Sequence, residues 1–310
     1  MSSVRRPVVG YALYMSAAML FSINGTVSKL LMEQLDATRL SQLRASAAFV
    51  VLLVAVLITR PKALRINGWG EFRLIALYGI LGVTMTQWLY FIGIHLLPVG
   101  VALILEFTAP LMVAVWVKFA WNHHIQRMVW LGLFVALSGL VLITEVWNGF
   151  RLDVLGVTAS LGAAAALAIY YLAGERLLTG QYRRDSLSLT MWGFGMAAAF
   201  WAVFQPWWTF PFERLAGVGE IATSFVKFDA PLWGMATWMV VMGTVIPFWL
   251  ALMAMNHISA QQASAIGMTE PVLASVVALI VMGETLSLWQ VVGGLVTLAG
   301  ISIAEVARGR

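Results

Sequence analysis

Apolar residues fill this chain in long uninterrupted stretches, and short polar connections separate the stretches. A helix needs about 20 consecutive, mostly apolar residues to cross the hydrocarbon core of a bilayer. Ten stretches reach that length, so the pattern predicts an all-α integral membrane protein with ten transmembrane helices. We place these helices at 9–31, 37–59, 72–93, 98–119, 128–147, 153–176, 187–208, 232–255, 259–282 and 287–306.

Most connections between these stretches are too short to hold an extramembrane domain. The longest runs from Thr209 to Ala230. Its weak apolar pattern favours a short interfacial helix around Phe212–Phe225.

The pattern also repeats within the chain. Residues 94–144 recur with a shift of 161 positions, which aligns Pro110 with Pro271. We therefore expect one membrane domain built from two halves, 1–150 and 151–310. Each half holds five helices, and this odd number places the second half upside down relative to the first. Two inverted-topology five-helix repeats around a midplane site are typical of secondary transporters.

Small residues recur at four-residue spacing in two of the predicted helices: Gly132 with Ala136, and Gly293 with Thr297. This spacing lets two helix backbones approach closely. We expect tight packing of these helices within one chain or between two, so a monomer and a homodimer are both compatible with the sequence.

The composition supports a membrane protein and excludes several other classes. Hydrophobic residues make up 61% of the 310 residues and charged residues 11%, far from the values of soluble domains. The absence of cysteine excludes thiolate catalysis, disulfides and cysteine metal sites. The net charge of +5 lies in short loops between apolar runs, which argues against nucleic acid as a partner. We expect no metal and no cofactor.

The loop charges also predict an orientation. With the N-terminus in the cytoplasm, thirteen Lys and Arg residues fall on the cytoplasmic side and six on the other. Cytoplasmic loops of membrane proteins carry the excess of basic residues. We therefore expect both termini in the cytoplasm.

Prolines and acidic residues inside the apolar stretches are the first candidates for function. Pro110, Pro247 and Pro271 interrupt predicted helices, and irregular backbone at membrane depth must be covered by protein or line a cavity. Glu106 lies one turn before Pro110, and Glu270 directly precedes Pro271. Ionisable groups inside the membrane are costly and commonly functional. Either glutamate could carry a proton or accept a substrate ammonium group; the alternative is a fixed structural partner.

Two cations and a third acid are candidates for gating or structural roles. Arg44 lies too deep in the second helix to reach the interface easily and is expected to pair with a carboxylate or with carbonyl groups. Lys29 matches Glu175 at a repeat shift of 146. Inverted topology places these two on opposite sides of the membrane, as gate residues or as side chains reaching the interface from helix ends.

Uncharged polar residues supply the remaining candidates. Ligand sites combine apolar walls with a few placed polar groups. The residues of that kind that we assign to a substrate cavity are Asn24, Gln87, Tyr90, Tyr170 and Trp238. Each of them could equally form a hydrogen bond between helices.

The chain resembles the drug/metabolite transporter superfamily, EamA type, over nearly its whole length. The features that carry the resemblance are Asn24–Lys29, Gln42–Arg44, Glu106–Pro110, Glu270–Pro271, the turn Gly283-Glu284-Thr285-Leu286-Ser287 and the segment Gly293–Gly300. The first half departs from the pattern, because Trp121-Asn122-His123-His124-Ile125 replaces the Gly-Glu turn.

The resemblance implies an inner-membrane exporter of amino acids or related small metabolites that works by alternating access, with or without proton coupling. Lipid surrounds it, and a small-molecule substrate is its ligand. The main alternative is an exporter of drugs or lipophilic cations. A membrane-embedded enzyme lacks support, since no nucleophile–base set or phosphate-binding loop is visible in the sequence. A channel lacks it too, since nothing resembles a selectivity ring.

Overall fold

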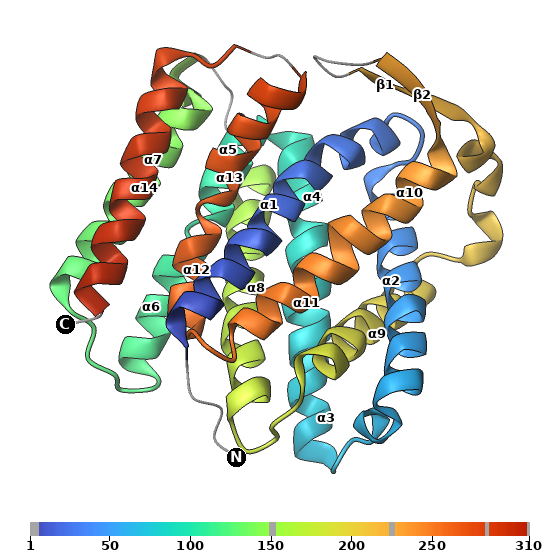
Figure 1. Cartoon of the computed structure of the whole chain (residues 1–310), viewed down its shortest axis with the longest axis horizontal. Coiled ribbons are helices and arrows are strands. Elements are labelled where there is room, and N and C mark those ends of the chain that lie inside the picture. Colours follow the sequence, from blue (N-terminus) through green and yellow to red (C-terminus); the bar gives the residue numbers. More distant parts are fainter. Residues whose placement is uncertain (1–5, 149–152, 223–226, 283–284, 309–310) are drawn as a thin grey trace.

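The computed structural model describes residues 6–148, 153–222, 227–282 and 285–308. Within these ranges, ten helical spans are long and apolar enough to cross a membrane, so the predicted number of transmembrane helices is confirmed. The spans run alongside one another as one bundle, with both termini at the same end (Figure 1).

Six of the spans are continuous α-helices. They are α1 (Pro7–Met32), α2 (Ala37–Thr59), α7 (Arg127–Thr144), α8 (Val154–Thr179), α9 (Ser186–Phe204) and α14 (Leu288–Arg308). Asp36, Asp153 and Asp185 begin α2, α8 and α9, and each carboxylate accepts a hydrogen bond from a backbone amide of the first turn. These caps satisfy donors that a helix leaves without a partner inside the helix.

The other four spans are interrupted. Two contain a π-helical segment. The first of these consists of α3 (Trp69–Ala76), the π-helical residues 77–84 and α4 (Met85–Leu96). The second consists of α10 (Leu232–Val240), the π-helical residues 241–245 and α11 (Ile246–Ala254). The other two are broken into two helices. One span consists of α5 (Val99–Glu106) and α6 (Ala109–Phe119). The other consists of α12 (Ala260–Gly267) and α13 (Glu270–Val277), and a π-helical segment at 278–282 follows α13. Short 3₁₀ turns lie at 61–64, 146–148, 207–209 and 212–216.

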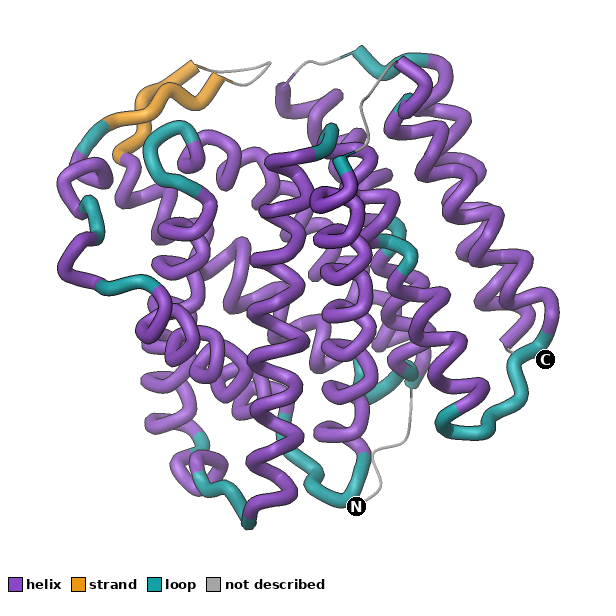
Figure 2. Tube along the Cα trace, turned by 180° about the vertical axis from the view of Figure 1, so that it is seen from behind, coloured by secondary structure: helices purple, strands orange, loops and turns teal. Residues whose placement is uncertain are grey.

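A β-hairpin stands at the end of the bundle opposite the termini. Strand β1 (Val218–Ala222) pairs antiparallel with β2 (Lys227–Pro231), with Val218 opposite Pro231. Seen from behind, helices make up nearly all of the described chain and the hairpin projects from one end (Figure 2).

The predicted interfacial helix at Phe212–Phe225 is therefore wrong in its described part. A 3₁₀ turn occupies 212–216 and strand β1 follows; residues 223–226 lie outside the described residues. Gly217 and Gly219 disfavour a helix, and the β-branched Val218 favours an extended chain. These local preferences prevail because the segment has no apolar helical face to bury.

The outer surface of the bundle is apolar. Large side chains of α2, α7 and α14 are exposed, including Ile58, Phe134 and Leu295, and Ile58 is 77% exposed. A water-soluble protein rarely exposes so continuous an apolar belt, so lipid is the environment that this surface fits.

Helices α7 and α14 pack closely through glycine. A Cβ atom built on Gly293 would lie 2.6 Å from the carbonyl oxygen of Gly139 and 2.6 Å from the amide nitrogen of Ile143. A Cβ on Gly132 would likewise lie 2.6 Å from the carbonyl oxygen of Gly300. The predicted tight packing of these small-residue helices is confirmed, and it joins the two halves of one chain.

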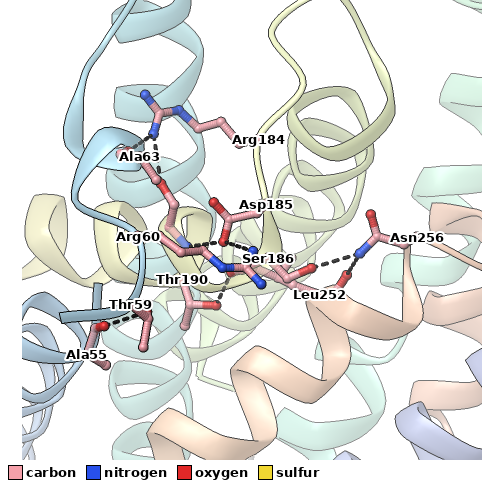
Figure 3. Close-up of polar contacts among 11 residues, drawn as sticks. Ala55, Thr59, Arg60, Ala63, Arg184, Asp185, Ser186, Thr190, Leu252 and Asn256 are labelled. Atoms are coloured by element: carbon pink, nitrogen blue, oxygen red, sulfur yellow. Dashed lines mark hydrogen bonds and ion pairs between the residues drawn. The ribbon is translucent and has the colours of Figure 1, made fainter. Parts of the chain in front are cut away.

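Polar contacts around Arg60, Arg184 and Asp185 tie helix ends together (Figure 3). The buried Arg184 side chain donates to Glu71 at 2.5 Å and to the Ala63 carbonyl at 2.8 Å. Asp185, which caps α9, also pairs with Arg60 at the end of α2, with 3.1 Å between the charged atoms. These contacts fix the ends of α2, α3 and α9 relative to one another.

The glycine contact gives a stability prediction with a control one residue away. We expect Gly293→Ala to lower the free energy of unfolding by about 1–3 kcal/mol, because its Cβ would meet backbone atoms that cannot rotate away. Gly294→Ala serves as the control, since its nearest contact would be a Val272 methyl group at 3.5 Å. Thermal unfolding of both variants in detergent measures the difference; equal midpoints would contradict the close packing.

Candidate functional site

The helix breaks place two carboxylates inside the bundle. Glu106 is the last residue of α5, and Glu270 is the first residue of α13. Pro110 and Pro271 follow in the first turn of α6 and α13. A proline is tolerated there because first-turn amides have no acceptor within the helix. The two breaks fall at matching positions of the shift of 161, as the aligned prolines predict.

Pro247 has a similar place. It is the second residue of α11, which follows the π-helical segment 241–245. The π-helical segment of the third span, 77–84, lies at the corresponding position of the shift of 161. In each segment a threonine hydroxyl, Thr84 or Thr244, donates to the carbonyl five residues earlier at 2.9 Å. Side chains thus cover carbonyl groups where the regular helix pattern is lost.

A charged cluster surrounds the two glutamates. Glu270 lies within electrostatic range of Glu106 and of Arg44. Tyr90 interacts electrostatically with both glutamates. The Arg44 Nη2 donates a hydrogen bond to Gln87 Oε1. The structure therefore brings together five of the residues that the sequence selects, from α2, α4, α5 and α13.

An aromatic layer lies between this cluster and the end that holds the termini. The hydroxyl groups of Tyr14 and Tyr171 form a hydrogen bond, and their ring centres are 6.4 Å apart. Tyr170 stacks on Tyr78 at 5.4 Å and meets Phe248 edge-on at 5.8 Å. All five of these side chains are buried. We expect water and solute to pass this layer only if the helices that carry it separate.

Packing along α1 changes toward the end of the bundle opposite the termini. Tyr14, Ala18 and Gly25 lie on one face of α1, since they are four and seven residues apart. Tyr14 is 4% exposed and Ala18 is 1% exposed. Gly25 is exposed, and a Cβ built on it would have no atom within 4 Å. Along a single face of α1, packing thus gives way to open space toward the end opposite the termini.

The other predicted residues have different surroundings. Asn24 is buried against Gly243, and its Oδ1 has no hydrogen-bond partner among the described residues. Tyr170 belongs to the aromatic layer rather than to the charged cluster. Trp238 is partly buried in α10, and no interaction shown among the described residues links it to the glutamates.

The two residues assigned to gates lie on different helices. Glu175 accepts a hydrogen bond from the Ala260 amide at 3.0 Å, which ties α8 to the start of α12. Lys29 belongs to α1, and its side chain lies outside the described part of the structure. Their gating roles stay predictions.

Sequence reasoning missed two features of the site. Tyr14 closes the aromatic layer, and the Ser22 hydroxyl donates to the Glu270 carbonyl at 3.1 Å. Both lie on α1 in a stretch whose apolar average hides single polar side chains. A second network was also missed, in which Glu305 accepts from Tyr11 at 2.8 Å and from Gln262 at 3.2 Å.

Ten membrane-length spans with broken helices around buried charges define a polytopic membrane protein of the transporter class. The EamA-like transporter family matches residues 8–145 and again 154–305. The chain therefore belongs to the EamA-like transporter family, and it is a transporter rather than an enzyme.

Relatives agree with this assignment. The chain is 26% identical to the uncharacterized transporter YdfC of Bacillus subtilis over 82% of this chain and 76% of the relative. It is 25% identical to the threonine/homoserine exporter RhtA of Salmonella typhimurium over 75% of this chain and 71% of the relative. A solved crystal structure has the same fold, with a TM-score of 0.74, 16% identity, and coverage of 97% of this chain and 98% of the other.

The open face of α1 can be tested by cysteine labelling, because the chain contains no cysteine of its own. We expect Gly25→Cys in lipid nanodiscs to react with a charged maleimide at least about tenfold faster than Ala18→Cys, since thiol reactivity requires solvent access. Ala18→Cys lies on the same face and serves as the control. Equal labelling rates would contradict the open arrangement.

Proposed function

We propose that this protein exports amino acids or related small metabolites across the inner membrane by alternating access. The similarity to a threonine/homoserine exporter supports this substrate class. The observation that carries the proposal is the pair of glutamates at matching helix breaks, with one arginine beside them.

The charges of the cluster do not balance without an added positive charge. Arg44 compensates one carboxylate. Among the side chains that the structure describes, no cation interacts with Glu106. An uncompensated charge in the bilayer interior is costly. A proton or a substrate ammonium group would supply the missing charge, and exchange of one for the other at Glu106 and Glu270 would couple proton entry to solute export.

The two-state cycle rests on the internal repeat. We propose that 1–150 and 151–310 are five-helix repeats of inverted topology and that they rock against each other around the charged cluster. The matching breaks at Pro110 and Pro271 support this division. The closed aromatic layer and the open space at Gly25 then describe one of the two states.

The positive-inside pattern orients this state. It supports cytoplasmic termini. The aromatic layer then closes the cytoplasmic side, and the open space at Gly25 faces outward. The glycine contact between α7 and α14 lies within one chain, and a monomer and a homodimer are both compatible with it.

An exporter of lipophilic cations is the second candidate, since the glutamates and the surrounding tyrosines could attract positive charge. Arg44 beside Glu270 disfavours this reading, because a fixed cation repels a ligand that carries positive charge alone. Competition between amino acids and cationic dyes for transport separates the two functions.

Counterflow tests the proposal directly. With purified protein in liposomes, we expect an unlabelled amino acid inside to drive uptake of the labelled amino acid, while cationic dyes and nucleosides give none. Protein-free liposomes are the control. Exchange of dyes alone would favour the second candidate, and no exchange of any solute by folded protein would refute both.

Coupling is tested by removing the proton gradient. We expect solute export against a concentration gradient to stop when an uncoupler collapses the proton gradient in vesicles, while counterflow continues. Counterflow needs no proton gradient, so it serves as the internal control. Undiminished uphill export after collapse would refute proton coupling.

The role of Glu106 is tested by Glu106→Gln, which keeps the shape and removes the charge. We expect the folded variant to lose uphill export, because its side chain can no longer bind and release a proton. The control is Glu33→Gln at the exposed end of α1, which should export like the unmodified protein. Normal uphill export by Glu106→Gln would leave Glu106 with a structural role.

A further inference from the structure

A small pocket lies beside Arg44, on the side of the charged cluster away from the glutamates. It lies between α2, the π-helical part of the third span, α4 and α9. Its lining includes the polar residues Ser41, Arg44, Thr84 and Gln87 and the aromatic residues Phe194 and Trp201. Neither the sequence nor the proposed role of the glutamates assigns a ligand to this pocket.

Several N–H groups that line the pocket have no acceptor among the described residues. A guanidinium carries five N–H donors. Arg44 makes one hydrogen bond in the described structure, to Gln87 Oε1. That bond also orients the Gln87 side chain and leaves the two donors of its amide nitrogen without a partner among the described residues. Arg44 and Gln87 are each only partly buried.

The other polar groups of the pocket do not meet this demand. The Ser41 hydroxyl donates to the Ala37 carbonyl at 2.9 Å, and the Thr84 hydroxyl donates to the Gly79 carbonyl at 2.9 Å. The two hydroxyls thus direct their protons to the helix backbone. The N–H groups of Arg44 and Gln87 therefore still need an acceptor. A planar anion that accepts several hydrogen bonds would fit this arrangement. A carboxylate has that chemistry, and arginine binds it through two parallel hydrogen bonds.

The size of the pocket fits one end of a solute rather than a whole one. The space open to the centre of a water molecule is about 10 Å³. A cavity of this size accommodates about one water molecule. The walls formed by Phe194 and Trp201 on α9 close it on the far side. The remainder of a bound molecule must therefore lie outside the pocket.

We propose that this pocket binds the carboxylate of a zwitterionic α-amino acid, with Arg44 and Gln87 as donors, while Glu270 and Glu106 receive the ammonium group. In an α-amino acid both charged groups are attached to one carbon atom, so their receptors must be adjacent. Arg44 and Glu270 lie within electrostatic range of each other, which is compatible with that requirement. This inference rests on the proposed export of amino acids and names the residue that selects for them.

The inference makes Arg44 a specificity determinant. A solute with an ammonium group and no carboxylate would leave the guanidinium without an anion and add positive charge beside it. Lysine at this position would keep the charge and lose the planar fork. Selection against amines that lack a carboxylate should therefore depend on the guanidinium itself.

The experiment compares matched solutes on matched variants. Purified protein in nanodiscs is titrated with L-threonine and L-threoninamide, and with L-alanine and L-alaninamide; each amide lacks the carboxylate and keeps the ammonium. We expect the unmodified protein to bind the amino acids at least about tenfold more tightly than the amides, because charge-assisted hydrogen bonds are the strong ones. Arg44→Gln and Arg44→Lys should reduce that preference by weakening amino-acid binding, and Arg44→Gln should also remove the repulsion of the amides.

Two further variants keep the test decisive. Gln87→Met preserves shape and removes a donor, and it should reduce the same preference partially even if the Arg44 variants do not fold. Arg60→Gln, at the surface end of the same helix, should leave the preference unchanged.

Three outcomes would overturn the inference. Equal losses for amino acids and amides in the Arg44 and Gln87 variants would make both residues structural. An unmodified protein that binds amides as tightly as amino acids has no carboxylate site, although it can still export them. If the unmodified protein binds none of the four solutes, the proposed amino-acid export fails and this inference fails with it.

Discussion

The hydrocarbon core of a bilayer contains no water to hydrogen-bond a peptide group or to solvate a charge. This constraint accounts for most of what the chain does. Six spans keep every backbone bond inside a continuous helix and present apolar side chains outward. In two of the four interrupted spans, a threonine hydroxyl covers a carbonyl group where the regular helix pattern is lost. Broken helices and buried charges therefore occur together, and their meeting point is the candidate site.

Close packing and open space are distributed unevenly around that site. The contact between α7 and α14 depends on positions where only glycine fits, so the two helix backbones lie against each other there. At the repeat shift of 146, Tyr171 corresponds to Gly25. One is a buried ring that closes the bundle, and the other is an exposed glycine beside open space. These two positions correspond at the shift of 146, but one carries a large side chain and the other carries none. Packing therefore differs between the two places in the bundle.

The charged cluster connects this asymmetry with chemistry. Two carboxylates and one guanidinium leave a place for one more positive charge, and the guanidinium retains donors for one negative charge. A zwitterion makes both contacts but is neutral overall, so it leaves the net charge of the cluster unchanged, whereas a proton neutralises one carboxylate. The ammonium group and a proton would both bind at the glutamates, and for that reason they would compete for one site in the proposed cycle.

The sequence alone determined the membrane class, the ten spans and the family, because a helix in lipid needs a long apolar stretch that is visible in any single segment. It also located both glutamates and the two breaks, since an acid or a proline stands out in such a stretch. It misplaced the 212–225 segment, where local propensity without a burial pattern decides the structure. Which polar residues meet was decided only by the tertiary structure: Arg44 bonds to Gln87 on another helix, Tyr170 joins the aromatic layer, and Tyr14 closes it. Those contacts depend on how helices rotate and cross, and that depends on packing between residues far apart in the chain, which the apolar pattern of one helix does not encode.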